Sequence, residues 1–166
     1  TASMFILALI SAIGLGGFGG LYLGTATSDL YFQETYFVVG HFHLMIGTVT
    51  MFGTFAGIYF WYPKMFGRMM NEKLGRVHLW LTIVPMISIF MIMHLQGMGH
   101  LLRRTYESAY DFQKPVTGMH LVISLLSFLL MGGQFVFLWN FFRSRTQGGK
   151  AEPNPWRSAG LEWTTE

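Results

Sequence analysis

Residues 35–62 read TYFVVGHFHLMIGTVTMFGTFAGIYFWY and contain no Asp, Glu, Lys or Arg. Three further long runs of the chain are equally free of charge. A helix needs about 20 apolar residues to cross the hydrocarbon core of a bilayer. A helix of a soluble protein would show a polar stripe, and these runs show none. The sequence therefore predicts an all-α integral membrane protein. Its four transmembrane helices are expected at about residues 4–24, 35–62, 77–99 and 115–142.

The composition agrees with a lipid environment. The chain is 52% hydrophobic and only 11% charged, whereas soluble domains average about 25% charged residues. We expect residues 1–145 to form the four-helix transmembrane segment and residues 146–166 a cytoplasmic C-terminal tail. The chain opens with TASMFILALI, without an initiator Met or a basic leading region, so we expect it to continue a longer protein. Cysteine is absent, which excludes disulfides and thiolate ligands. The partner that this composition indicates is a bilayer, not a nucleic acid.

Basic residues orient the spans, because they favour the cytoplasmic side of a membrane. The connection at residues 25–34 holds only acids, Asp29 and Glu34. Arg103 and Arg104 are the exception, since they lie in a connection that alternation places on the outer side. Eight of the 11 basic residues lie on the predicted inner side: Lys64, Arg68, Lys73, Arg76, Arg143, Arg145, Lys150 and Arg157.

Histidines gather at one level of the predicted membrane. Within a span such residues either hydrogen-bond to neighbouring helices or mark a functional site. The small residues between 14 and 20 predict a close approach of the first helix to a neighbour. Only His78 lies near the inner side; the outer-level histidines are His41, His43, His94, His100 and His120.

The His-x-His spacing adds a geometric constraint. Residues i and i+2 lie about 200° apart around a helix, so His41 and His43 point in nearly opposite directions. Either one of them only packs, or each serves a different centre, and imidazole is a common axial ligand of haem iron. Haem propionates on the outer side would account for Arg103 and Arg104, because guanidinium groups pair with carboxylates. The alternative is an ordinary surface loop held by acids such as Glu107 or Asp111.

Four segments resemble subunit I of the haem–copper terminal oxidases. Residues 34–43, ETYFVVGHFH, resemble the DTYYVVAHFH segment on the tenth transmembrane helix of that family. Residues 60–67 (FWYPKMFG) with Leu74 and Gly75 resemble the inner loop that follows. Residues 96–106 resemble the GMPRRY loop, and residues 161–165 the LEW terminus seen in many cytochrome c oxidases. The resemblance implies that the spans are helices nine to twelve of a twelve-helix bundle.

The resemblance also implies roles for individual residues. His41 would be the catalytic residue, as proximal ligand of the high-spin haem, and His43 one of two axial ligands of the low-spin haem. Phe42 would lie between the haems. Arg103 and Arg104 would bind propionates. The resemblance further implies that Asp29 lies near a propionate of the high-spin haem.

Two departures from the family pattern concern the outer side. Many members carry His-Asp where this chain has Gln33 and Glu34, and that pair helps to bind magnesium. Glu34 is thus a candidate magnesium ligand without its imidazole partner. The arginine loop reads GMGHLLRR, with four residues between GM and RR where GMPRRY has one.

The resemblance implies further components outside this chain. These are the copper with its three histidines, the second low-spin ligand on the remainder of subunit I, subunits II and III, and an electron donor. The family reduces oxygen to water and pumps protons. The LEW end favours cytochrome c over quinol as donor, and we expect a bacterial cytoplasmic membrane ahead of a mitochondrial inner membrane. Competing hypotheses are a b-type membrane cytochrome, with His94 or His120 opposite His41 or His43, and a haem-free accessory subunit.

Overall fold

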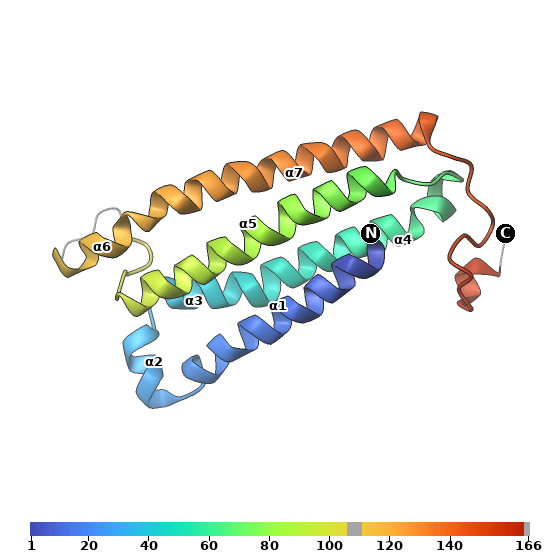
Figure 1. Ribbon diagram of the computed structural model, residues 1–166. Coiled ribbons are helices and arrows are strands. Elements are labelled where there is room, and N and C mark those ends of the chain that lie inside the picture. Colours follow the sequence, from blue (N-terminus) through green and yellow to red (C-terminus); the bar gives the residue numbers. More distant parts are fainter. Residues whose placement is uncertain (106–110, 165–166) are drawn as a thin grey trace.

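The computed structural model describes residues 1–105 and 111–164, and within these ranges it contains helices and no strand (Figure 1). Four helices of the described part are long and apolar enough to cross a membrane, so the predicted fold class is confirmed. Tyr106, Glu107 and Thr165, which the sequence singled out, lie outside the described residues.

The helices follow one another along the chain with short connections. In order they are α1 (Ala2–Leu23), α2 (Ala26–Phe32), α3 (Tyr36–Phe42), the π-helix η1 (His43–Thr48), α4 (Val49–Phe66), α5 (Glu72–Met98), the 3-10 turn η2 (Asp111–Gln113), α6 (Lys114–Thr117), α7 (Met119–Gln147) and the 3-10 turn η3 (Leu161–Trp163).

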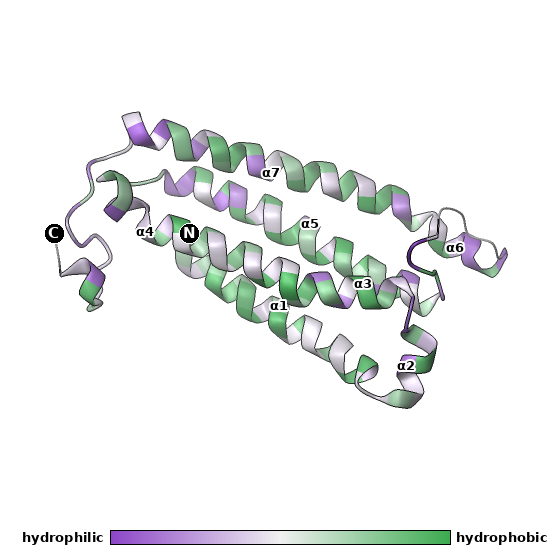
Figure 2. Ribbon diagram, turned by 180° about the vertical axis from the view of Figure 1, so that it is seen from behind, coloured by the Kyte–Doolittle hydropathy of each residue, from purple (hydrophilic) through white to green (hydrophobic). Residues whose placement is uncertain are grey.

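The four spans lie side by side in the order α7, α5, α3–α4 and α1 (Figure 1). The second span is continuous from α3 through η1 to α4. Figure 2 shows apolar residues along the spans and hydrophilic residues toward their ends and connections. This distribution suits lipid, where helices satisfy every backbone polar group internally.

Local sequence explains where the helices begin and end. Thr35 caps α3, because its side chain accepts a hydrogen bond from the Phe37 amide over 3.2 Å. Asn71 caps α5 by accepting from the amides of Lys73 and Leu74. Ser, Thr, Asn and Asp are the preferred residues at such positions. At the other end of α4, Gly67 adopts a left-handed conformation with φ 64°, which ends many helices.

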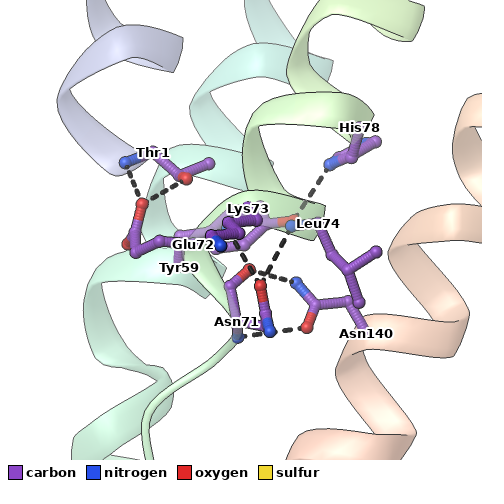
Figure 3. A network of polar contacts seen from close by, with 8 residues as sticks. All are labelled: Thr1, Tyr59, Asn71, Glu72, Lys73, Leu74, His78 and Asn140. Atoms are coloured by element: carbon purple, nitrogen blue, oxygen red, sulfur yellow. Dashed lines mark hydrogen bonds and ion pairs between the residues drawn. The ribbon is translucent and has the colours of Figure 1, made fainter.

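A buried asparagine ties α7 to the start of α5. The Asn140 side chain accepts from the Asn71 amide over 3.1 Å and donates to the Asn71 carbonyl over 3.0 Å (Figure 3). Nearby, the Tyr59 hydroxyl and the His78 Nδ1 lie 3.2 Å apart. Both Asn140 and His78 are fully buried. These contacts hold the start of α5 against α7 and α4.

The C-terminal tail folds back onto α4. The Trp156 indole donates to the Phe60 carbonyl oxygen over 2.8 Å, and Trp163 is buried against the Phe60 ring. The Arg68 guanidinium donates to the Gly148 carbonyl oxygen over 2.7 Å. α7 runs to Gln147, slightly beyond the predicted start of the tail. The tail is therefore docked on the helix row as far as the structure describes it.

Two glycines let α3 and α5 cross closely. A β-carbon at Gly40 would lie 2.8 Å from the Phe90 carbonyl oxygen. A β-carbon at Gly97 would run into the backbone of Phe37. Tight helix crossings in membranes use such small residues. These contacts hold α3, the first part of the second span, against α5.

We expect Gly97→Ala to destabilise this crossing by about 1–3 kcal/mol or more, the usual cost of overpacking. The backbone of Phe37 cannot yield as a flexible side chain does. Thermal unfolding of the detergent-solubilised assembly measures the effect. Gly132→Ala is the matched control, because its β-carbon would meet no atom within 4 Å. An equal loss of stability in both variants would contradict the close crossing.

Candidate functional site

His41 faces α1. Its Nδ1 lies 2.9 Å from the Gly16 carbonyl oxygen. Because a carbonyl oxygen only accepts, Nδ1 carries the proton, and the lone pair of Nε2 is free to bind a metal. The ring also lies against Gly19 and Gly20, where β-carbons would be 3.0 Å from Nδ1 and 3.2 Å from Cε1. The close approach predicted from the small residues of the first helix is thus present.

His43 faces α5. Its Nδ1 lies 2.9 Å from the Val39 carbonyl oxygen one turn earlier, so its Nε2 is also the free nitrogen. The imidazole stacks on Phe90 with ring centroids 5.3 Å apart and an interplanar angle of 26°. The two histidines therefore point to different neighbours, as the i, i+2 spacing predicts.

The π-helix begins at His43. π-helical turns are rare and occur mainly at functional sites. Here η1 starts at the second of the two histidines, and the Thr48 hydroxyl donates to the His43 carbonyl oxygen over 3.2 Å. The irregular turn thus lies next to the candidate site.

A mainly apolar groove of about 540 Å³ opens in front of His43. Ligand pockets commonly have volumes of about 300–1,000 Å³. Arg103 and Arg104 are among the residues that line this groove, and Phe42 contacts the His43 ring edge-on. The groove is lined by Tyr36, Val38, Val39, Phe42, His43, Met93, Arg103 and Arg104. The structure thus brings together His43 and the arginine pair, which are far apart in the sequence.

Backbone hydrogen bonds join the loop that carries Arg103 and Arg104 to the segment before α3. The Tyr36 amide donates to the Leu101 carbonyl oxygen over 2.9 Å, and the Arg103 amide donates to the Glu34 carbonyl oxygen over 2.8 Å. Thr35 and Leu102 form an isolated antiparallel bridge. These bonds hold both arginines at the groove.

Glu34 pairs with Arg103, whereas the alternative interpretation of the sequence named Glu107 or Asp111 as the acids of this loop. The Arg103 Nε donates to Glu34 Oε2 over 3.0 Å, and Nη2 donates to Oε1. This contact holds the pKa of the Glu34 carboxyl below its usual value of 4.5 and raises the pKa of Arg103. The pair is therefore complete above about pH 4.5 and is lost as the pH falls through the lowered pKa. Asp111 pairs instead with Lys114.

Asp29 lies apart from the groove. It belongs to α2, and it is not among the described residues that line the groove. Of the remaining histidines, His94 lies near His41, since a β-carbon at Gly19 would be 3.0 Å from both His41 Nδ1 and His94 Nε2. His94 donates to the Phe90 carbonyl oxygen over 2.7 Å, and His120 lies against Tyr36.

Sequence reasoning missed Phe90 and Met93 of α5, which complete the surroundings of His43. An apolar residue in a charge-free span carries no local signal that distinguishes it from its neighbours. Only the crossing of α3 over α5 selects these two.

The fold and the site define a multi-pass, all-helical membrane protein whose second span directs two imidazoles to different neighbours. Residues 1–140 match the family described as cytochrome C and quinol oxidase polypeptide I. The chain belongs to this family.

Several relatives align with nearly the whole chain. It is 40% identical over 166 residues to cytochrome c oxidase subunit 1 of Thermostichus vulcanus and 37% identical over 165 residues to that of Synechocystis sp.; each alignment covers 99% of this chain and 29% of the relative. A heme–copper terminal oxidase dimer solved by cryo-electron microscopy has a similar fold, with a TM-score of 0.75 at 19% identity over 91% of this chain and 28% of that one. The chain thus spans less than a third of these relatives.

Proposed function

We propose that this chain is the C-terminal part of the catalytic subunit of a respiratory terminal oxidase. The complete subunit would reduce oxygen to water with electrons from cytochrome c or an equivalent donor and couple the reaction to proton pumping. One observation carries the proposal: two imidazoles on one helix turn have Nδ1 tied to backbone carbonyl oxygens and Nε2 free, and they face different neighbours.

The arrangement supports the roles that the family resemblance implies. His41 would bind the iron of the high-spin haem and His43 that of the low-spin haem, each through Nε2. A ligating histidine usually donates its other ring N–H to a carbonyl or carboxylate, which fixes the ring and its tautomer. The Gly16 and Val39 carbonyl oxygens do this for His41 and His43.

The residues around His43 fit a haem. A haem is flat and mostly apolar with two carboxylates at one edge, and the groove is mostly apolar and is lined by two arginines. Arg103 and Arg104 would bind propionates, and Phe42 would lie between the two haems. When bound, the haems supply the redox and oxygen-binding chemistry. The residues of this chain hold them, orient them and keep water from their apolar faces. Asp29 is proposed to lie near a propionate of the high-spin haem in the complete subunit.

Other components would come from outside this chain. Among the described residues there is no group of three or more His, Cys, Asp and Glu that could hold a metal ion. As the family resemblance implies, we propose that the copper ligands and the second low-spin ligand come from the remainder of subunit I. We propose subunits II and III as further partners and the bacterial cytoplasmic membrane as the location. Oxygen uptake with reduced cytochrome c or with quinol as sole donor tests the choice of donor.

An absorption spectrum tests the proposal against a b-type cytochrome. In such a cytochrome, His94 or His120 would be the second ligand on this chain. In the part of the chain that the structure describes, His43 is the one histidine that lines the groove. We expect the double variant His94→Gln/His120→Gln of the complete assembly to keep both haem signals, because glutamine can still donate to the Phe90 carbonyl oxygen. Loss of the low-spin signal in the single variant His120→Gln, with the chain still assembled, would favour the b-type cytochrome.

A further inference from the structure

The two departures from the family pattern meet at one place in the structure. Glu34 stands in the segment before α3, and Arg103 stands in the lengthened loop after α5. Their side chains form paired hydrogen bonds across 69 residues of sequence. Paired, charge-assisted bonds of this kind fix geometry as well as charge.

The backbone around this pair is held in uncommon conformations. Glu34 has φ 66° and Arg104 has φ 64°, in the left-handed region that non-glycine residues seldom adopt. Such conformations persist where surrounding contacts over-determine them. Here the contacts are the bonds from the Arg103 amide to the Glu34 carbonyl oxygen and from the Tyr36 amide to the Leu101 carbonyl oxygen. The two backbone bonds and the ion pair thus join the connection before α3 to the connection after α5.

The groups that Glu34 and Gln33 offer at this place do not suit a divalent cation. Magnesium requires several oxygen ligands in near-octahedral geometry, usually with one or two carboxylates. Both Glu34 oxygens accept from Arg103, and Gln33 offers a neutral amide where many relatives of this family carry an imidazole. A guanidinium in contact with the carboxylate also repels a second cation.

We propose that Glu34 is a positioning residue for Arg103 and that this ion pair takes the place of a bound divalent cation. The carboxylate holds the Arg103 guanidinium at the His43 groove, where it can pair with an acidic group of the ligand. The positioning role rests on the proposed function, because it requires a haem in the groove. The proposal that the ion pair takes the place of a divalent cation does not depend on the proposed function.

Metal content tests the cation. The complete purified assembly is prepared from cells grown with manganese, and bound magnesium and manganese are measured by mass spectrometry and electron paramagnetic resonance. We expect the wild type and Glu34→Gln to hold the same amounts. Loss of one equivalent in Glu34→Gln would overturn the proposal, because Glu34 would then be a metal ligand.

The midpoint potential of the low-spin haem tests the positioning. A positive charge near a haem favours the reduced form. If Glu34 acts by holding Arg103, Glu34→Gln lowers the potential, as Arg103→Gln does, and adds nothing in the double variant. If Glu34 acted only as a nearby negative charge, Glu34→Gln would raise the potential, with or without Arg103. A raised potential would overturn the positioning role.

Three controls accompany this measurement. Asp111→Asn breaks the other outer ion pair of the described residues, that with Lys114, and we expect it to leave the potential unchanged. Glu34→Asp keeps a carboxylate and should restore most of the wild-type potential. A His43 variant that kept the low-spin haem would contradict the proposed function. The metal content would still test whether Glu34 binds a divalent cation.

Discussion

His43→Ala is expected to remove the low-spin haem signal from the assembled oxidase. The variant loses the only free imidazole nitrogen among the described residues that line the groove. Mutation of groups that merely orient a metal ligand costs about 10–100-fold in affinity or activity. Removal of the ligand itself should therefore lower the rate of oxygen uptake by more than about 100-fold. The absorption spectrum of the purified assembly and its steady-state oxygen consumption measure the two effects.

His100→Gln is the matched control for this experiment. His100 also lies at the outer end, but it contacts Tyr31 and does not line the groove. It should keep both the low-spin signal and the activity. A His43→Ala assembly with an unchanged low-spin spectrum would contradict the proposed site.

The second large effect concerns the opposite side of the same helix. We expect His41→Ala to retain the low-spin signal and to lose oxygen reduction almost completely. The reason is geometric, since His41 faces Gly16 on α1 and His43 faces Phe90 on α5. The carbon monoxide difference spectrum reports the high-spin haem, and its amplitude should fall with the activity.

The pair of variants is more informative than either one. Two separate centres predict that each substitution removes a different spectral signal. A single shared centre predicts that both substitutions remove the same signal. Selective loss in each variant supports the assignment of one haem to each histidine, and joint loss with the chain still assembled would refute it.

Much of the site could be predicted from local sequence. The HFH spacing predicted that the two imidazoles diverge, and the glycines between 14 and 20 predicted a close approach of the first helix. Each feature is a local property of a single helix, so it depends little on the rest of the fold. The placement of Arg103 and Arg104 near His43 was predicted only through their common membrane level and the family resemblance.

The partner of Arg103 could not be predicted in this way. The sequence offered Glu107 and Asp111 as nearby acids, whereas the structure pairs Arg103 with Glu34. Glu34 lies 69 residues away in the sequence. Its selection depends on the backbone bonds that join the two outer segments.

The sequence by itself determined the four membrane spans, because a bilayer demands long charge-free helices and the chain contains four such runs. It also determined that His41 and His43 diverge, because the helical repeat allows no other arrangement. Only the tertiary structure decided that α5 supplies Met93 to the His43 groove and Phe90 to a stack on the His43 ring, and that Glu34 pairs with Arg103. These contacts follow from how closely α3 and α5 cross at Gly40 and Gly97. The separation of α3 and α5 depends on both helices together, so the sequence periodicity of either helix alone does not predict it.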